Sequence, residues 1–325
     1  MSERQLEPYR AWLQDSVPLV VRGWCPAAGQ RRYQQASDEL IERTTDDAAS
    51  RRYAEACPVA GVDHTRYRLR ELTLPHGVRL LAGVHFRGQC SHYPFVGVFA
   101  QSRWLTTGET AAAHAALLSE FSVFAPRATW WWLPAGKDLP ELAGVTPDQH
   151  LVMGSLDEIR RIPASPLPPH WVLRRLDSAS EVSTAFADLY RSFHSARPDL
   201  EEAVPATKLE ALVDCAEAEG LYGCFAGGDL MGVVAVKPDT QYSVDAWLMW
   251  DIVLARPYCG KGLASILQRA VLDRLDAARA PLVVGTINAR NLPSLRTALR
   301  VGRQVVGTWM FMEVEAASIV GQCDA

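Results

Sequence analysis

The sequence predicts an α/β (α+β) fold in two domains, and three observations predict it. An apolar strand runs into a tight glycine loop, and the loop opens a helix, at residues 252–264. Further strands and helices alternate from residue 171 to residue 314. A segment with four prolines in seven residues, 163–169, precedes this region, and such a composition is typical of a stiff extended linker. The sequence therefore predicts a domain boundary at this linker.

The predicted N-terminal domain comprises residues 1–162, and a linker of residues 163–170 follows it. Its first 60 residues are polar and helical in pattern, and β-rich segments with one helix come after them. The strands are expected at residues 67–74, 78–86, 93–99 and 128–133, and the helix begins near Thr107.

The predicted C-terminal domain comprises residues 171–325, and its apolar periodicity changes repeatedly between that of a strand and that of a helix. Gly227 and Gly228 separate two short strands and predict a hairpin. The strands are expected at residues 171–176, 221–226, 230–237, 241–255, 281–287 and 304–314, and the helices at 178–195, 207–219, 265–272 and 292–300.

The glycine loop predicts an anion site. Gly260 and Gly262 have no side chains, so their backbone can approach a bulky anion. The unpaired N–H groups of the following helix turn would bind a phosphate or a pyrophosphate. The loop is not a P-loop, because no Lys-Ser/Thr pair closes it, and it lacks the third glycine of the dinucleotide fingerprint.

Residues 170–315 resemble the GNAT N-acetyltransferase superfamily, because a strand, a phosphate loop, a helix, a strand, an Asn-x-x-Ser helix and a strand follow in that order. The resemblance implies a mixed central sheet flanked by helices, with acetyl-CoA as co-substrate and no metal. It also implies backbone contacts of the last strand residues with the pantetheine arm, and amide contacts of the loop with the pyrophosphate. The residues so assigned to the cofactor are Ile252, Val253, Leu254, Ala255, Cys259, Gly260, Lys261, Gly262, Leu263, Ala264, Asn291 and Ser294.

The loop departs from the family pattern in two places, because Pro257 and Cys259 replace the Gln/Arg and Arg that the family often has. Lys261 keeps a positive charge there. Cys259 has two interpretations: a thiol that ionises easily at a helix N-terminus, or a side chain that faces away from the ligand. For Asn291 the alternative to a cofactor contact is an N-cap.

Transfer to an amine requires a base for the amine proton and benefits from an acid for the leaving thiolate. Strict alternation along the strand would place residues 245, 247, 249, 251 and 253 on one face. Asp251 on that face is the predicted general base, with a structural carboxylate as the alternative. The family's tyrosine position falls on Ala298, so the acid would be Tyr258 or water.

The N-terminal domain has two open interpretations. Its element order echoes the C-terminal domain, which would make the chain a tandem GNAT arrangement with a degenerate first half. Residues 101–108 contain no Gly-x-Gly, so this half is expected to bind no CoA. The alternative is an unrelated α+β domain.

Composition limits the function classes. The chain has 325 residues, 48% of them hydrophobic, and a net charge of −4, which argues against a general nucleic-acid surface. The sequence has no apolar run long enough for a membrane helix and no signal-peptide core at its start, and its seven cysteines form no CxxC pair. We therefore expect a cytoplasmic enzyme that does not bind membranes, in an oligomeric state that the sequence does not specify.

These features favour an N-acetyltransferase (EC 2.3.1 class) that transfers an acetyl or other acyl group to a primary amine of a small molecule or protein. Two alternatives remain open. One is a non-catalytic acyl-CoA sensor, because alanine replaces the family's tyrosine at position 298. The other is an aminoacyl-tRNA-dependent transferase, which would need a basic groove and would not need a phosphate loop.

Overall fold

The computed structural model describes residues 3–32, 44, 46–87, 93–137, 144–241 and 244–314. Contacts between Cα atoms divide the chain into two compact units. The first unit consists of residues 1–148 and 307–325, and the second consists of residues 149–306. The domain boundary that the sequence predicts at the proline-rich linker, residues 163–170, remains a prediction.

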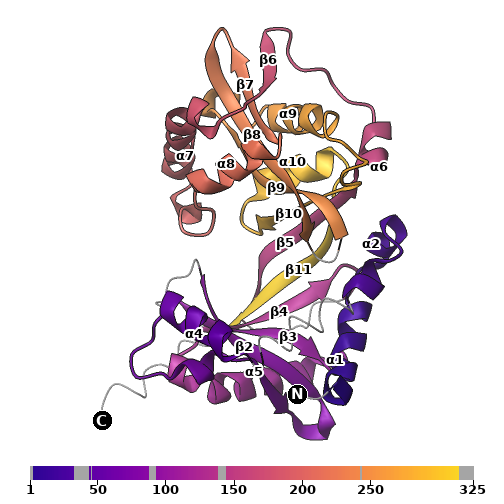
Figure 1. The fold of residues 1–325 in the computed structure, drawn as a ribbon, viewed down its shortest axis with the longest axis vertical. Coiled ribbons are helices and arrows are strands. Elements are labelled where there is room, and N and C mark those ends of the chain that lie inside the picture. The colour runs from indigo at the N-terminus through magenta and orange to yellow at the C-terminus, as the bar shows by residue number, and fades with distance from the viewer. Residues whose placement is uncertain are drawn as a thin grey trace. The chain divides into compact units, whose positions relative to one another are not determined.

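From β6 (Trp171–Arg175) onward, the second unit alternates strands and helices in the order that the sequence predicts (Figure 1). Two strands, β5 and β11, begin in one unit and end in the other. The elements are β5 (Val145–Ser155), α6 (Leu156–Arg161), β6 (Trp171–Arg175), α7 (Ser183–Ala196), α8 (Leu209–Glu217), β7 (Leu221–Ala226), β8 (Asp229–Gln241), β9 (Val244–Leu254), α9 (Leu263–Leu272), β10 (Leu282–Asn288), α10 (Leu292–Arg300) and β11 (Gln304–Glu313).

The sheet of the second unit is mixed, as predicted. Its strand order is β5-β10-β9-β8-β7-β6. β9 and β10 are parallel, and the other neighbours are antiparallel. The predicted hairpin joins β7 to β8 through Gly227 and Gly228, whose φ angles are +61° and +98°. Two successive residues with positive φ make a turn whose twist matches that of the strands.

Helices cover both faces of this sheet. Alternate residues of β8 belong to different cores, because Val233 packs with one cluster and Val234 with the other. On the first face, α7 and α8 bury Phe186 and Leu212. On the second face, α9 buries Leu267 and further apolar residues. Each such side chain contributes about 1.5–3 kcal/mol to folding, so both layers hold the sheet firmly.

The parallel strands β9 and β10 separate partway along their length. Leu282–Val284 pair with residues 246–248, and the ladder then ends. Beyond this point β10 stays paired with β5 as far as Asn288, and β9 stays paired with β8. A gap therefore opens within the sheet next to residues 249–254.

The first unit has its own smaller sheet, in the order β1-β2-β3-β4-β11. The predicted succession of three strands, a helix and a strand is confirmed. Part of the expected helical start, residues 33–43 and 45, lies outside the described residues. The elements are α1 (Glu3–Asp15), α2 (Leu19–Trp24), α4 (Asp47–Ala56), β1 (Arg70–Thr73), β2 (Arg79–Phe86), β3 (Pro94–Gln101), α5 (Thr107–Glu120) and β4 (Ala128–Pro134).

The two units exchange strands along the chain. β5 follows β4 in sequence, but its residues 149–155 pair with β10. β11 follows α10, but its residues 307–313 pair with β4. β5 was not predicted from the sequence, because its first half is polar and contains Pro147, which argues against a central strand. In the described part of the chain, no helix is long and apolar enough to cross a membrane.

Candidate functional site

The predicted phosphate loop joins β9 to α9. Gly260 and Gly262 have φ angles of +75° and +76°, in the left-handed region that favours glycine. Gly262 is the N-cap of α9, and no side chain caps this helix. The N–H groups of its first turn are therefore open to an external anion.

A cavity of about 600 Å³ lies against this loop. Most of the residues predicted to bind the cofactor line it: Ile252, Val253, Leu254, Cys259, Gly260, Gly262, Leu263, Ala264, Asn291 and Ser294. Ala255 and Lys261 are not among its lining residues. The N–H of Ala255 instead donates to the carbonyl of Met231 at 2.8 Å, which holds the end of β9 against β8.

Besides Arg197, which pairs with Asp199, three arginines that the sequence analysis did not identify line the same cavity. They are Arg256 in the loop and Arg296 and Arg300 on α10. The Arg300 guanidinium lies close to the loop, since a Cβ on Gly262 would be 3.4 Å from its Nη1. None of the three has a carboxylate partner among the residues that the structure describes. The i, i+4 spacing of the two α10 residues places them on one helix face, which is the signal that could have found them.

A second cavity, of about 130 Å³, occupies the gap between β9 and β10. It shares five lining residues with the larger cavity: Phe193, Ile252, Val253, Asn291 and Ser294. Asp251 and Tyr190 line it as well. The larger cavity at the phosphate loop and the gap at Asp251 are therefore adjoining parts of one site in the second unit.

Asp251 is buried and strongly hydrogen-bonded. Its carboxylate accepts from the Tyr190 hydroxyl, at 2.8 Å to Oδ2, and from Thr207 Oγ1, at 2.6 Å to the same oxygen. Burial raises the pKa of Asp251 from its ordinary value of 3.8 to about 6, although the hydrogen bonds from Thr207 and Tyr190 act in the opposite direction. The carboxylate is therefore ionised at neutral pH and close to its protonation point.

Tyr190 keeps its proton. Burial first, then the negative charge of Asp251, raises the pKa of this hydroxyl above its usual range. Tyr190 on α7 and Thr207, which precedes α8, together tie both helices to β9 through one carboxylate. The sequence could not predict these two contacts, because Tyr190 lies 61 residues and Thr207 lies 44 residues before Asp251.

The expected alternation of faces along β9 is wrong beyond Met249. The register with β8 passes from Val236↔Met249 to Ala235↔Asp251, so Trp250 is an extra, bulged residue. Met249 packs with the α9 core, whereas Val253 packs with the α7 and α8 core. A bulge shifts all later side chains to the opposite face, and this shift turns Asp251 toward α7.

Tyr258, the predicted acid, is partly buried and lines the larger cavity. Its ring meets Trp171 edge to face, with centroids 5.4 Å apart. Cys259 points back to the strand end, because its Sγ donates to the Leu254 and Ala255 carbonyls at 3.6 and 3.7 Å. Burial raises the pKa of this thiol, which favours the second interpretation, a side chain that faces away from the ligand.

Asn291 is the N-cap of α10, since its side chain accepts from the Ser294 N–H at 3.4 Å. Both residues also line both cavities, so capping and ligand contact are compatible. Ala298, at the family's tyrosine position, is buried in the core at 1% exposed.

Two further buried polar side chains line the gap. Arg303 is 3% exposed, and its Nη2 donates to the Val152 carbonyl at 2.8 Å. Burial lowers the pKa of Arg303 to about 10, and no carboxylate in the described residues pairs with it. The Gln268 amide oxygen is likewise buried and has no described partner. The gap therefore lies between a buried carboxylate, Asp251, and a buried guanidinium.

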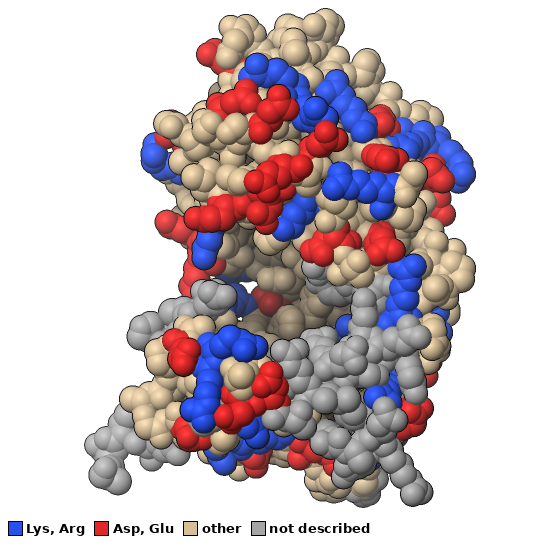
Figure 2. Space-filling model, viewed as in Figure 1, with Lys and Arg blue, Asp and Glu red and all other residues tan. Residues whose placement is uncertain are grey.

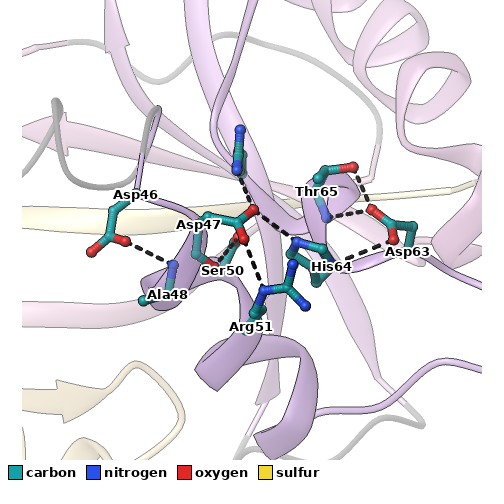
Figure 3. Close-up of polar contacts among 9 residues, drawn as sticks. Asp46, Asp47, Ala48, Ser50, Arg51, Asp63, His64 and Thr65 are labelled. Carbon is teal, nitrogen blue, oxygen red and sulfur yellow. Dashed lines mark hydrogen bonds and ion pairs between the residues drawn. The ribbon is translucent and has the colours of Figure 1, made fainter.

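A polar cluster in the first unit is structural in character (Figure 3). Asp47 bonds Arg51 Nε and His64 Nε2, each at 2.8 Å. These two contacts, Arg51 before His64, lower the pKa of Asp47 to about 2. The cluster ties the start of α4 to the turn at residues 64–67. No group of three or more His, Cys, Asp or Glu side chains in the described residues could hold a metal ion.

Comparison with known families identifies the second unit. Residues 184–302 match the model of the acetyltransferase (GNAT) family. The matched range runs from the start of α7 to Gly302, so it includes the phosphate loop, Asp251 and Asn291. A search of curated protein sequences found no match.

Solved structures match nearly the whole chain. A GCN5-related N-acetyltransferase from Sphaerobacter thermophilus is 14% identical with a TM-score of 0.51, over 84% of this chain and 93% of that chain. A GNAT acetyltransferase from Colwellia psychrerythraea is 11% identical with a TM-score of 0.48, over 82% of this chain and 95% of that chain. A tandem GNAT protein from the clavulanic acid biosynthesis pathway is 14% identical with a TM-score of 0.43, over 82% of this chain and 94% of that chain. At this identity the first match shows a common fold. The family match identifies residues 184–302 as a GNAT acetyltransferase domain.

Proposed function

We propose that the chain is an N-acetyltransferase (EC 2.3.1 class). It would transfer an acetyl or other acyl group from acetyl-CoA to a primary amine of a small molecule or protein, by direct attack on the thioester. One observation carries this proposal. The cavity at the uncapped glycine loop shares five lining residues with the gap that contains Asp251. A donor anchored at the loop can thus place its thioester beside a buried base.

Acetyl-CoA would be held by positively charged side chains and by backbone groups of β9 that have no partner strand. The pyrophosphate would bind the α9 amides, and Arg256, Arg296 and Arg300 would neutralise its phosphates. Beyond Leu248, β9 has no ladder partner on its β10 side. Its backbone there can pair with the amides of a pantetheine arm, as a further strand would.

The acceptor amine would attack the thioester carbon with its lone pair. As the C–N bond forms, the C–S bond breaks, and the amine proton passes to Asp251 directly or through a water. A pKa of about 6 suits this role, since a base works best when its pKa is near the operating pH. The thiolate would take its proton from Tyr258 or water, and the positive charge of Arg303 would favour the negative charge that develops in the gap.

The non-catalytic sensor is the second candidate function, and one observation favours it. Ala298 occupies the family's tyrosine position and is buried, so it offers no acid. The third candidate, an aminoacyl-tRNA-dependent transferase, would need a basic groove. On the face drawn in Figure 2, Lys and Arg side chains are interspersed with Asp and Glu over the second unit, a pattern that gives that function no support.

Calorimetric titration with acetyl-CoA tests the donor site. Gly260→Glu should abolish binding, because it places a negative charge where the pyrophosphate would lie. Gly228→Glu is the matched control, since both glycines have positive φ and open space beyond the Cβ position. Equal affinities for the two variants would contradict the proposed site.

Thiol release with a panel of amines then separates the enzyme from the sensor. An enzyme releases CoA with at least one amine, and Asp251→Asn slows this release. A sensor binds acetyl-CoA and releases no thiol with any amine.

A further inference from the structure

The first unit contains a cavity of its own, with a volume of about 330 Å³. Aromatic and apolar side chains form most of its wall, notably Trp104, Trp131, Trp132 and Phe311. Two of the indole N–H groups are already used, because Trp131 donates to Thr129 Oγ1 at 2.7 Å and Trp132 donates to the Ser16 carbonyl at 3.4 Å. These walls therefore offer ring faces to a ligand rather than hydrogen bonds.

The cavity occupies a gap between parallel strands. β3 and β4 pair only at Val96↔Thr129 and Gly97↔Trp130. After these pairs β4 continues alongside β11, and Gln101, at the end of β3, lines the cavity together with the indoles of β4.

This cavity does not suit a phosphate. The adjoining helix α5 is closed by a capping box, in which the Thr106 side chain accepts from the Glu109 N–H and the Glu109 side chain accepts from the Thr106 N–H. Arg103 also bonds the Glu109 carboxylate. The first turn thus already has its own acceptors, so its N–H groups are not open to an incoming anion.

Gln101 supplies a polar feature that points to a ligand, and Lys137, whose ammonium lies over the Trp104 ring, lines the cavity as well. Gln101 is 5% exposed, and its amide oxygen accepts no hydrogen bond from any residue that the structure describes. A buried acceptor without a donor is costly. A ligand that carries a donor would remove this cost.

We propose that this cavity binds a flat, uncharged aromatic molecule with one N–H donor. The rings would pack against the indoles of Trp104, Trp131 and Trp132, and the N–H would donate to the Gln101 amide oxygen. Aromatic surfaces favour such offset or edge-to-face contacts, and the volume lies within the range of small-molecule sites. The site is independent of the CoA site in the second unit.

Indole and benzofuran test the proposal on the full chain, because they have the same shape and only indole has the N–H. Titration calorimetry and saturation-transfer NMR should show indole binding about tenfold more tightly than benzofuran. Gln101→Leu should bring the two affinities within about twofold. Gly260→Glu should leave indole binding unchanged, because that residue belongs to the other site.

Two results would overturn the proposal: no binding of either probe at millimolar concentration, or equal affinities of the two probes for the unaltered chain. The second comparison needs no variant, so it decides the question even if Gln101→Leu does not fold.

Discussion

Replacing Asp251 by asparagine should stabilise the protein while it removes activity. The pKa of this carboxyl rises from 3.8 to about 6 on folding, chiefly because it is buried. A difference of that size means that the ionised form costs the folded state about 3 kcal/mol. Asparagine has nearly the same shape, and its carbonyl oxygen can accept from Tyr190 and Thr207. Its NH2 group cannot accept from the backbone N–H groups of Ile252 and Thr207, which limits the gain. The variant should therefore gain up to about 3 kcal/mol in free energy of unfolding at pH 8.

The gain should depend on pH in a defined direction. Because the folded state binds the Asp251 proton more tightly than the unfolded state does, the native chain loses stability as the pH rises from about 4 to about 6. The asparagine variant has no such group. Its advantage should therefore be close to zero at about pH 4, grow up to about pH 6, and stay constant above that.

Urea denaturation at a series of pH values measures this advantage, and thiol release measures the activity. If Asp251 is the base, activity should fall by about 10²–10⁴-fold. Asp245→Asn is the control on the same strand, because Asp245 is exposed and its carboxylate accepts from Thr240 Oγ1 of the neighbouring strand β8 at 2.9 Å. A stability difference that does not change with pH would refute the burial argument, and full activity in the variant would refute the base.

Three further results are expected. Thr207→Val removes a hydrogen bond that lowers the pKa of Asp251, so the pH at which activity is half-maximal should move upward. Arg300→Gln should weaken acetyl-CoA binding by roughly tenfold or more, as calorimetry can show, whereas Arg191→Gln, which breaks an exposed pair with its own helix neighbour, should leave it unchanged. Leu117→Ala opens a cavity at a fully buried position of α5 and should lower the free energy of unfolding by about 2–5 kcal/mol in urea.

The conformation of the glycine loop was predictable because its signal is local. Two glycines with positive φ and an uncapped helix start lie within five residues of chain, and each has a direct sequence correlate. The same is true of the Gly227-Gly228 hairpin and of the N-cap at Asn291. In each case the sequence contains both the residue and the reason for its conformation.

The surroundings of Asp251 were not predictable, because they depend on distant parts of the chain. Tyr190 and Thr207 meet this carboxylate from two other elements. The bulge at Trp250 arises from the pairing register with β8, and no residue of β9 by itself signals it. A strict alternation therefore gives a wrong account of what Asp251 faces.

The same backbone geometry occurs in both units of this chain. In each unit a pair of parallel strands separates after two or three residue pairs, and a helix follows the first strand. What differs is the start of that helix. Gly262 leaves α9 uncapped, whereas Thr106 and Glu109 satisfy the first turn of α5 from within. An anion can bind a helix start only where the chain has not supplied its own acceptors. The contrast between a Gly-x-Gly and a Thr-x-x-Glu sequence at these two positions therefore leaves the start of α9, and not that of α5, with N–H groups that an external anion could bind.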